Sequence, residues 1–299
     1  MEATKQRRDV YAIVTEKIIE HLEYGTVPWK QPWMDAGIPM NLATKRPYRG
    51  INALLLGICG YERNLFLTYK QLQSLGARVN KGEKAHMVVY WKIMEKEQEG
   101  EDGKTETAKI PMLRYYNVFN VSQCSGIPES KVPEMQASEV YPIEACEAVV
   151  QHMPDKPQIY HKGDSAYYHT LLDAIYLPVK QSFISMEAYY ETLFHELVHS
   201  SGHARRLNRP GIARLGPLEP EPYSFEELVA EMGACFLASH TGIEMDDFTN
   251  HAAYIQSWLK RLKDDKRMVV LAAAKAQQAV DYILGSKSDN LENTDGHGN

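Results

Sequence analysis

Residues 195 to 199 read His-Glu-Leu-Val-His, and this stretch decides how the C-terminal half of the chain must fold. In a helix, a spacing of four residues places His195 and His199 on one face about a turn apart, where both imidazoles can hold one tetrahedral Zn²⁺. The same geometry places Glu196 beside the water that such an ion would activate, as its general base. We therefore expect a helix here, capped by Ser185, with a zinc site on one face.

A second predicted helix, residues 225 to 240, carries two acids at a matching spacing. Glu227 and Glu231 are four residues apart, so one can ligate the metal while the other hydrogen-bonds a ligand imidazole. The residues alone leave the order of these two roles open. His203 is a competing ligand, although the metzincin spacing for a third histidine falls on Arg205. An oxyanion stabiliser is expected among three further side chains, Tyr223, His240 and His251.

The Glu227-x-x-x-Glu231 spacing resembles the E-x-x-x-D/E pattern of gluzincins. That resemblance implies that Glu227 is the third ligand, that Glu231 hydrogen-bonds a ligand imidazole, and that the activity is that of a zinc metallopeptidase. Another divalent ion such as Mn²⁺ is the alternative cofactor. A solvated helix face is the competing interpretation, but apolar Leu193, Leu197 and Val198 would bury the helix, and buried imidazoles need partners.

The N-terminal half combines aromatic rings with cations, as in Trp-Lys-Gln-Pro-Trp at residues 29 to 33. Bases of a single strand stack on such rings, while Lys and Arg neutralise phosphates. We therefore predict binding of single-stranded DNA rather than duplex. The alternative is that the tryptophans anchor a small core and the cations form a solvated rim. The predicted contact residues are Trp29, Lys30, Trp33, Lys45, Arg46, Tyr48, Arg49, Asn52, Lys70, Lys81, Lys84 and Trp91.

Charge is divided unevenly along the chain, whose formal net charge is −6. Residues 1 to 120 hold 18 Lys and Arg against 14 Asp and Glu, whereas residues 121 to 299 hold 15 against 25. Six of the acids in the first half lie between residues 95 and 106. We predict that this acidic stretch is a solvated hairpin loop between strands at 86 to 94 and 109 to 121. The remaining basic surface fits phosphates.

Length and composition predict an α+β protein of two domains. We place an ssDNA-binding domain at residues 1–130, a linker at 131–140, a mainly helical zincin-like metallopeptidase domain at 141–285 and a disordered tail at 286–299. The linker should let each domain fold independently. Helices are expected at 4–24, 51–58, 69–75, 143–152, 185–200, 225–240, 248–262 and 267–284, with a strand pair at 166–177.

Cysteine usage and hydropathy indicate the compartment. The four cysteines lie far apart, without a C-x-x-C pair, and the N-terminus is charged rather than apolar. The sequence contains no run of about 18 uncharged apolar residues. We therefore expect a cytoplasmic protein without a membrane partner.

Further motifs extend the pattern over nearly the whole chain. Together they resemble the ArdC-type antirestriction proteins of conjugative plasmids. The N-terminal half is similar to the ssDNA-binding domain shared with TraC-type plasmid primases, and the C-terminal half to the polyvalent-protein metallopeptidase domain. The resemblance implies that the protein enters a recipient with the transferred strand and helps it to escape restriction. The motifs are Pro-Trp-Lys at 28–30, Tyr-Arg-Gly-Ile-Asn at 48–52, Thr-Tyr-Lys-Gln at 68–71, Ser-Gly-His at 201–203, Arg-Leu-Asn-Arg at 206–209 and Glu-Glu-Leu-Val-Ala-Glu at 226–231.

Two other functions fit the same residues. One is a non-catalytic ssDNA-binding protein in which the metal ties helices together, although a structural site would be closed by four protein ligands. The other is a DNA-protein crosslink protease, to which DNA delivers the substrate; for the metallopeptidase interpretation, host restriction proteins or other DNA-bound proteins are the candidate substrates. Fragments of an ssDNA-bound partner protein would distinguish this protease from the binding protein.

Overall fold

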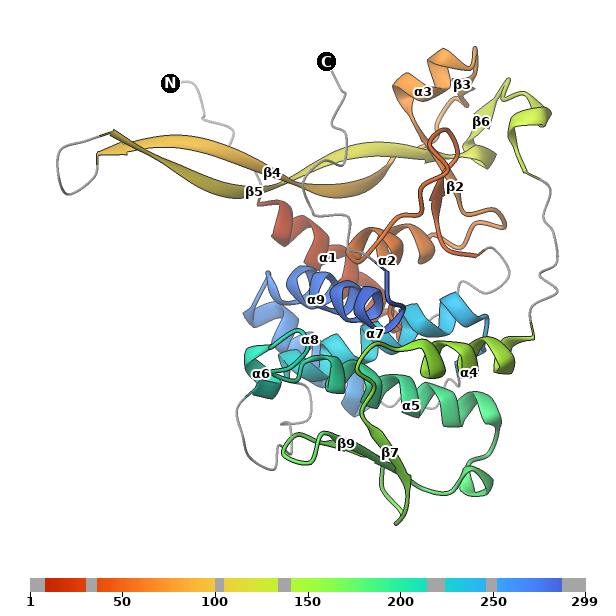
Figure 1. Ribbon diagram of the computed structural model, residues 1–299. Coiled ribbons are helices and arrows are strands. Elements are labelled where there is room, and N and C mark those ends of the chain that lie inside the picture. The colour runs from red at the N-terminus through yellow and green to blue at the C-terminus, as the bar shows by residue number, and fades with distance from the viewer. Residues whose placement is uncertain are drawn as a thin grey trace.

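The computed structural model describes residues 9–30, 37–99, 105–133, 141–213, 224–245 and 252–286, with the backbone alone for 94–99 and 105–110. The predicted α+β class is confirmed, because sheets dominate the N-terminal part and helices the C-terminal part (Figure 1). Five predicted features lie mostly or wholly outside the described residues: the linker at 131–140, the tail at 286–299, Trp33, Tyr223 and His251.

A four-stranded sheet in the order β1-β2-β5-β4 forms the centre of the N-terminal part. Its strands β1 and β2 are parallel, and the other neighbours are antiparallel. The three predicted helices of this part are present within the described residues, and two short strands form a second sheet. The elements are α1 (Val10–Glu23), β1 (Met40–Asn41), α2 (Ile51–Gly57), β2 (Leu65–Thr68), α3 (Tyr69–Ser74), β3 (Arg78–Val79), β4 (His86–Glu99), β5 (Thr105–Asn120), η1 (Val121–Gln123), β6 (Cys124–Ser125) and η2 (Glu129–Lys131).

Strands β4 and β5 form a long two-stranded ribbon that reaches away from the rest of the chain (Figure 1). Their pairing runs from His86 opposite Val118 to Glu99 opposite Thr105. The expected loop at residues 95 to 106 is therefore largely strand, and its tip at 100–104 lies outside the described residues. Antiparallel pairing satisfies the backbone N–H and C=O groups even where the side chains are charged, so the ladder continues into the acidic stretch.

The C-terminal part is built on three helices, α5, α7 and α9, which contact one another. The predicted strand pair is confirmed as β8 and β9, and β7, which the sequence prediction missed, adds to β9 in parallel. No described helix has the length and hydropathy needed to cross a bilayer. The elements are α4 (Pro142–His152), β7 (Gln158–His161), β8 (Tyr167–His169), β9 (Ala174–Leu177), η3 (Lys180–Ser182), α5 (Met186–Ser201), α6 (Pro210–Ala213), α7 (Phe225–Thr241), α8 (Ala252–Asp264) and α9 (Met268–Ile283).

The largest hydrophobic core cluster spans both parts, and two smaller clusters lie within the N-terminal part. The apolar face of α1, which includes Val14, Ile18 and Leu22, packs towards α8 and α9. An ion pair between Arg49 and Asp281 also joins the two parts. The two parts therefore pack against each other, with the amphipathic face of α1 buried against C-terminal helices, and independent folding stays a prediction.

A largely buried ion pair between Arg206 and Asp173 joins the three-stranded sheet to the turn after α5. Arg206 donates from Nη1 to Asp173 Oδ1 at 2.7 Å and from Nη2 to Oδ2 at 2.9 Å. The Tyr168 hydroxyl donates to Asp173 Oδ1 at 2.7 Å. Burial raises the pKa of Asp173, but the hydrogen bonds from Arg206 and Tyr168 outweigh burial and hold this pKa below its ordinary value.

Acid is expected to remove the contribution of this pair to stability. Because the folded-state pKa is depressed, the contribution is complete above the ordinary aspartate pKa of about 3.9 and is lost as the pH falls through the folded pKa. Asp173→Asn, which tolerates the φ of 47° at this position, is therefore expected to cost about 1–3 kcal/mol at pH 7 and less at about pH 3, below the ordinary aspartate pKa. Urea unfolding at both pH values tests this expectation, and an equal cost at both would contradict it.

Candidate metal centre

Two capped helices carry the site. Ser185 Oγ accepts a hydrogen bond from Ala188 N at 3.0 Å at the start of α5, which confirms the predicted N-cap. Ser224 Oγ accepts from Glu227 N at 3.2 Å at the start of α7. Glu226 and Glu227 thus lie in the first turn of α7, where the helix dipole stabilises negative charge.

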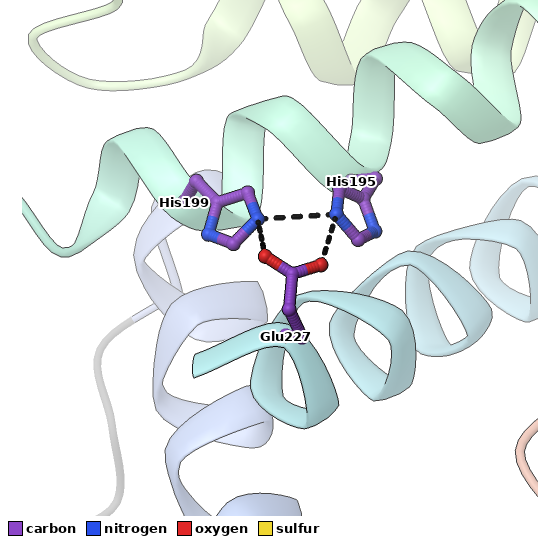
Figure 2. Close-up of side chains that lie close together, drawn as sticks. All are labelled: His195, His199 and Glu227. Atoms are coloured by element: carbon purple, nitrogen blue, oxygen red, sulfur yellow. Dashed lines mark hydrogen bonds and ion pairs between the residues drawn. The ribbon is translucent and has the colours of Figure 1, made fainter. Parts of the chain in front are cut away.

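Three predicted ligands, His195, His199 and Glu227, converge between these helices (Figure 2). The two imidazole Nε2 atoms lie 3.1 Å apart. Glu227 Oε2 lies 3.3 Å from His195 Nε2, and Glu227 Oε1 lies 3.3 Å from His199 Nε2. A tetrahedral ion with bonds of about 2.0–2.1 Å sets its donor atoms about 3.3 Å apart. These three side chains therefore have the spacing of a metal-binding group, which we call the metal group.

On the side of His199 that faces away from the metal group, the neighbouring carboxylate is that of Glu226. The sequence analysis did not single out Glu226 for this position. Glu226 Oε1 lies 3.5 Å from His199 Nδ1, the ring nitrogen that faces away from the metal group. Arg209 holds this carboxylate with hydrogen bonds from Nε to both oxygens, at 3.2 and 3.1 Å. Glu226 therefore lies within ion-pair distance of the His199 ring, and Arg209 holds the Glu226 carboxylate in place.

The role predicted for Glu231 is corrected. Its Oε2 accepts hydrogen bonds from Trp29 Nε1, at 2.7 Å, and from the Tyr254 hydroxyl. Within the described residues, its hydrogen bonds thus go to these two side chains and not to a ligand imidazole. A spacing of four residues places Glu231 on the same face of α7 as Glu227, but one turn further along, beyond the imidazoles.

Burial and charge set the protonation of the group. Burial by itself lowers the pKa of His199, but the hydrogen bonds to Glu226 and Glu227 raise this pKa to about 10. Burial raises the pKa of Glu227, yet the hydrogen bonds from His195 and His199 hold it well below its ordinary value. Because metals bind neutral imidazole, metal uptake must release the proton of His199.

The other candidate site residues, Glu196, His203 and His240, lie at different places relative to the metal group. Glu196 is buried on α5, next to His195 in the sequence, and its charge helps to raise the pKa of His199. His203 lies in the turn after α5, where its Nδ1 accepts from Arg205 N at 3.3 Å, and it is not part of the metal group. His240 lies at the far end of α7 from Glu227, about 20 Å along the helix, which is too far for an oxyanion stabiliser.

A cavity of about 190 Å³ opens beside His195. Its lining includes Glu191 of α5, Glu231 of α7 and Lys30 from the segment that follows α1. Lys30 Nζ lies 3.1 Å from Glu191 Oε1. Lys30, predicted as a DNA contact, therefore lies in the wall of the cavity beside the metal group.

Several other predicted DNA contacts are also part of the interior. Trp29 is fully buried and packs edge-to-face on Trp258, with ring centroids 5.7 Å apart, so it offers no ring face to a base. The alternative that it anchors a core is confirmed. Tyr48 is buried, and the Asn52 side chain exchanges two hydrogen bonds of 2.7 Å with the backbone of Val89. These side chains stabilise the N-terminal part rather than present a binding surface.

The cations among the remaining predicted DNA contacts are more accessible to solvent than Trp29, Tyr48 and Asn52. Trp91 is half-buried and lies edge-on to Tyr11. Two exposed rings that the sequence prediction missed are Tyr69, 57% exposed, and Tyr115, 49% exposed. Tyr69 could have been found, since it immediately precedes a predicted cation. The exposed predicted cations are Lys45, Arg46, Lys70, Lys81 and Lys84, together with Arg49, which is paired with Asp281.

Both the N-terminal and the C-terminal part of the chain match known protein families. The model of a zincin-like metallopeptidase family matches residues 144–275, and that of the N-terminal domain of the anti-restriction factor ArdC matches residues 8–119. Protein y4eC of Sinorhizobium fredii (strain NBRC 101917 / NGR234) is 34% identical over 297 residues, 95% of this chain and 94% of its own. The DNA primase TraC of Escherichia coli is 35% identical over 97% of this chain, which spans 21% of the primase.

Two solved structures of the antirestriction protein ArdC from plasmid R388 share the fold. The metal-free form has a TM-score of 0.73 and 37% identity, covering 92% of this chain and 96% of that one. The Mn(II)-bound form has a TM-score of 0.72 and 35% identity, covering 96% and 100%. With both family models, the full-length match and the metal group in agreement, the chain belongs to the ArdC family of antirestriction proteins, with a zincin-like metallopeptidase domain.

Proposed function

We propose that this protein binds single-stranded DNA through its N-terminal part, carries a zinc-dependent peptidase centre, and protects incoming DNA during conjugation. The observation that carries the peptidase assignment is the convergence of His195, His199 and Glu227; Glu196, the next residue after His195, is buried on the same helix. Three protein donors leave a coordination position for water or substrate, as catalytic zinc sites do and structural ones do not.

The side chains around the metal group divide the chemistry among them. Two imidazole nitrogens and one carboxylate oxygen suit Zn²⁺, and an R388 relative was crystallised with Mn(II). A bound ion would polarise a peptide carbonyl and acidify water. Glu196 would accept the proton of the attacking water and deliver it to the leaving amine. Glu226 would hold the His199 ring in position through Nδ1.

Exposed cations and rings on the N-terminal part support binding of single-stranded DNA. Tyr69 and Lys70 are adjacent on α3, which pairs a ring for base stacking with a cation for phosphate. Arg46, Lys81 and Lys84 are exposed on nearby loops of the same part. Neither stacking nor phosphate contact requires a particular base sequence, so the binding is expected to be largely independent of sequence.

Removing three of these cations is expected to weaken binding and to flatten its salt dependence. In the full-length Arg46→Gln, Lys81→Gln, Lys84→Gln variant, the slope of log K against log salt should fall by about 2, since each phosphate contact on a single strand contributes about 0.7. Fluorescence anisotropy with a labelled oligonucleotide at several salt concentrations measures both quantities.

A matched variant separates local contacts from net charge. Lys162, Lys260 and Lys275 are exposed on the C-terminal part, so changing all three to Gln removes the same charge elsewhere. We expect this variant to bind DNA nearly as the wild type does. Equal weakening in both variants would mean that net charge, and not an N-terminal surface, governs binding. A conjugation assay into a restricting recipient then shows whether protection is lost together with DNA binding.

A further inference from the structure

We propose that Trp29 and Lys30 are positioning residues of the metal group: this dipeptide holds α5 and α7 at the spacing at which His195, His199 and Glu227 converge. The inference rests on metal binding by that group, which is part of the proposed function. It assigns to the N-terminal part a role at the metal centre in addition to DNA binding.

The dipeptide contacts both metal-bearing helices, one turn away from the metal group in each case. Lys30 Nζ lies 3.1 Å from Glu191 Oε1, and Glu191 precedes His195 by four residues on α5. Trp29 Nε1 donates to Glu231 Oε2 at 2.7 Å, and Glu231 follows Glu227 by four residues on α7. Residues four apart lie above one another on a helix face. Two neighbouring side chains therefore join the two helices beside the metal group.

The cavity beside His195 explains why a bridge is needed there. Elsewhere the two helices pack directly, since a Cβ atom placed on Gly233 of α7 would lie 2.6 Å from Val198 Cγ2 of α5. Next to His195, Thr192 of α5 and Ala234 of α7 line the cavity of about 190 Å³, together with Lys30. At this point the bridging dipeptide adds contacts between the two helices beside the space that the cavity leaves unfilled.

The dipeptide is itself held firmly. The Trp29 indole is fully buried against Trp258, and its Nε1 also lies 3.3 Å from the Tyr254 hydroxyl. The side chains of Lys30 and Glu191 are 15% and 17% exposed, so water screens this ion pair less than a surface pair. Within the described residues, the dipeptide is thus held by its own side-chain contacts with α5, α7 and α8.

The test is the affinity of the full-length protein for Mn(II), measured by electron paramagnetic resonance at a temperature at which every variant is folded. Lys30→Met keeps the length of the side chain without its charge, and Trp29→Phe removes the N–H donor. Both are expected to weaken Mn(II) binding about 10-fold, as losses next to a metal ligand do. Lys30→Arg, which can still pair with Glu191, should restore near wild-type affinity, whereas a purely packing role would not distinguish Arg from Met.

Lys263 supplies the matched control. Its Nζ lies 2.8 Å from Glu23 Oε1 and so joins α8 to α1, but both side chains are about half exposed. We expect Lys263→Met to leave the Mn(II) affinity unchanged. Wild-type affinity in folded Lys30→Met and Trp29→Phe would overturn the inference while leaving the proposed function intact. If the wild type itself bound no Mn(II), or bound it as well after His195→Ala, the proposed metal centre would fail and the inference with it.

Discussion

Replacing His199 with alanine is expected to abolish metal binding, whereas Glu196→Gln is expected to leave it intact and to abolish peptide cleavage. His199 is buried and contributes one of three donor atoms, so its loss leaves two ligands. Glu227→Ala should have a similar effect. In the proposed function Glu196 acts as a base rather than a ligand, and removing a general base typically costs about 10²–10⁴-fold in rate. The variants should therefore separate ligation from proton transfer.

Two measurements decide this prediction. Metal content after dialysis against Zn²⁺ or Mn²⁺, read by mass spectrometry, gives ligation. Incubation with a protein bound to single-stranded DNA, read as fragments on a gel, gives cleavage. Metal loss in Glu196→Gln equal to that in His199→Ala would remove Glu196 from the role of base. If wild-type protein protects DNA in conjugation without cleaving, and Glu196→Gln protects equally, the metal is structural and DNA binding carries the function.

Replacing Arg209 with methionine is expected to destabilise the fold by about 3–5 kcal/mol, because it leaves the buried charge of Glu226 without its cation. The Arg209 side chain is 4% exposed. Besides Glu226, it donates from Nη1 to Ser201 Oγ at 2.8 Å and from Nη2 to the Val198 carbonyl at 2.6 Å. Burial raises the pKa of Glu226, but hydrogen bonds from His199 and Arg209 lower it overall, so this carboxylate is charged at neutral pH.

A neighbouring arginine provides the comparison for this prediction. Arg205 is 67% exposed and lies 3.6 Å from Asp155, so Arg205→Met is expected to change the free energy of unfolding by about 0.5 kcal/mol or less. Urea unfolding of both variants in the presence of a chelator excludes any contribution from bound metal. A cost for Arg209→Met within 1 kcal/mol of that for Arg205→Met would show that Glu226 finds another partner or takes up a proton.

Helix geometry made much of the metal centre predictable from the sequence. His195 and His199 lie on one face because of their spacing, and Ser185 marks the start of their helix. The resemblance to gluzincins supplied Glu227 as the third member of the metal group. The helices of both parts were found for the same reason, since hydrophobic periodicity is a local property of the chain.

The tertiary structure alone decided which residues support that centre. Glu226 lies behind His199 because α7 packs closely on α5, which Gly233 permits by having no side chain against Val198. Trp29 and Glu231 are 202 positions apart, and no periodicity links them. Residues within one helix are placed by a fixed rise and turn, whereas residues on different elements meet only where the packing of the whole core brings them together. The sequence by itself therefore determined the two histidines of the metal group, because their spacing is a property of one helix, and the core shared by the two parts decided which residues hold them in place.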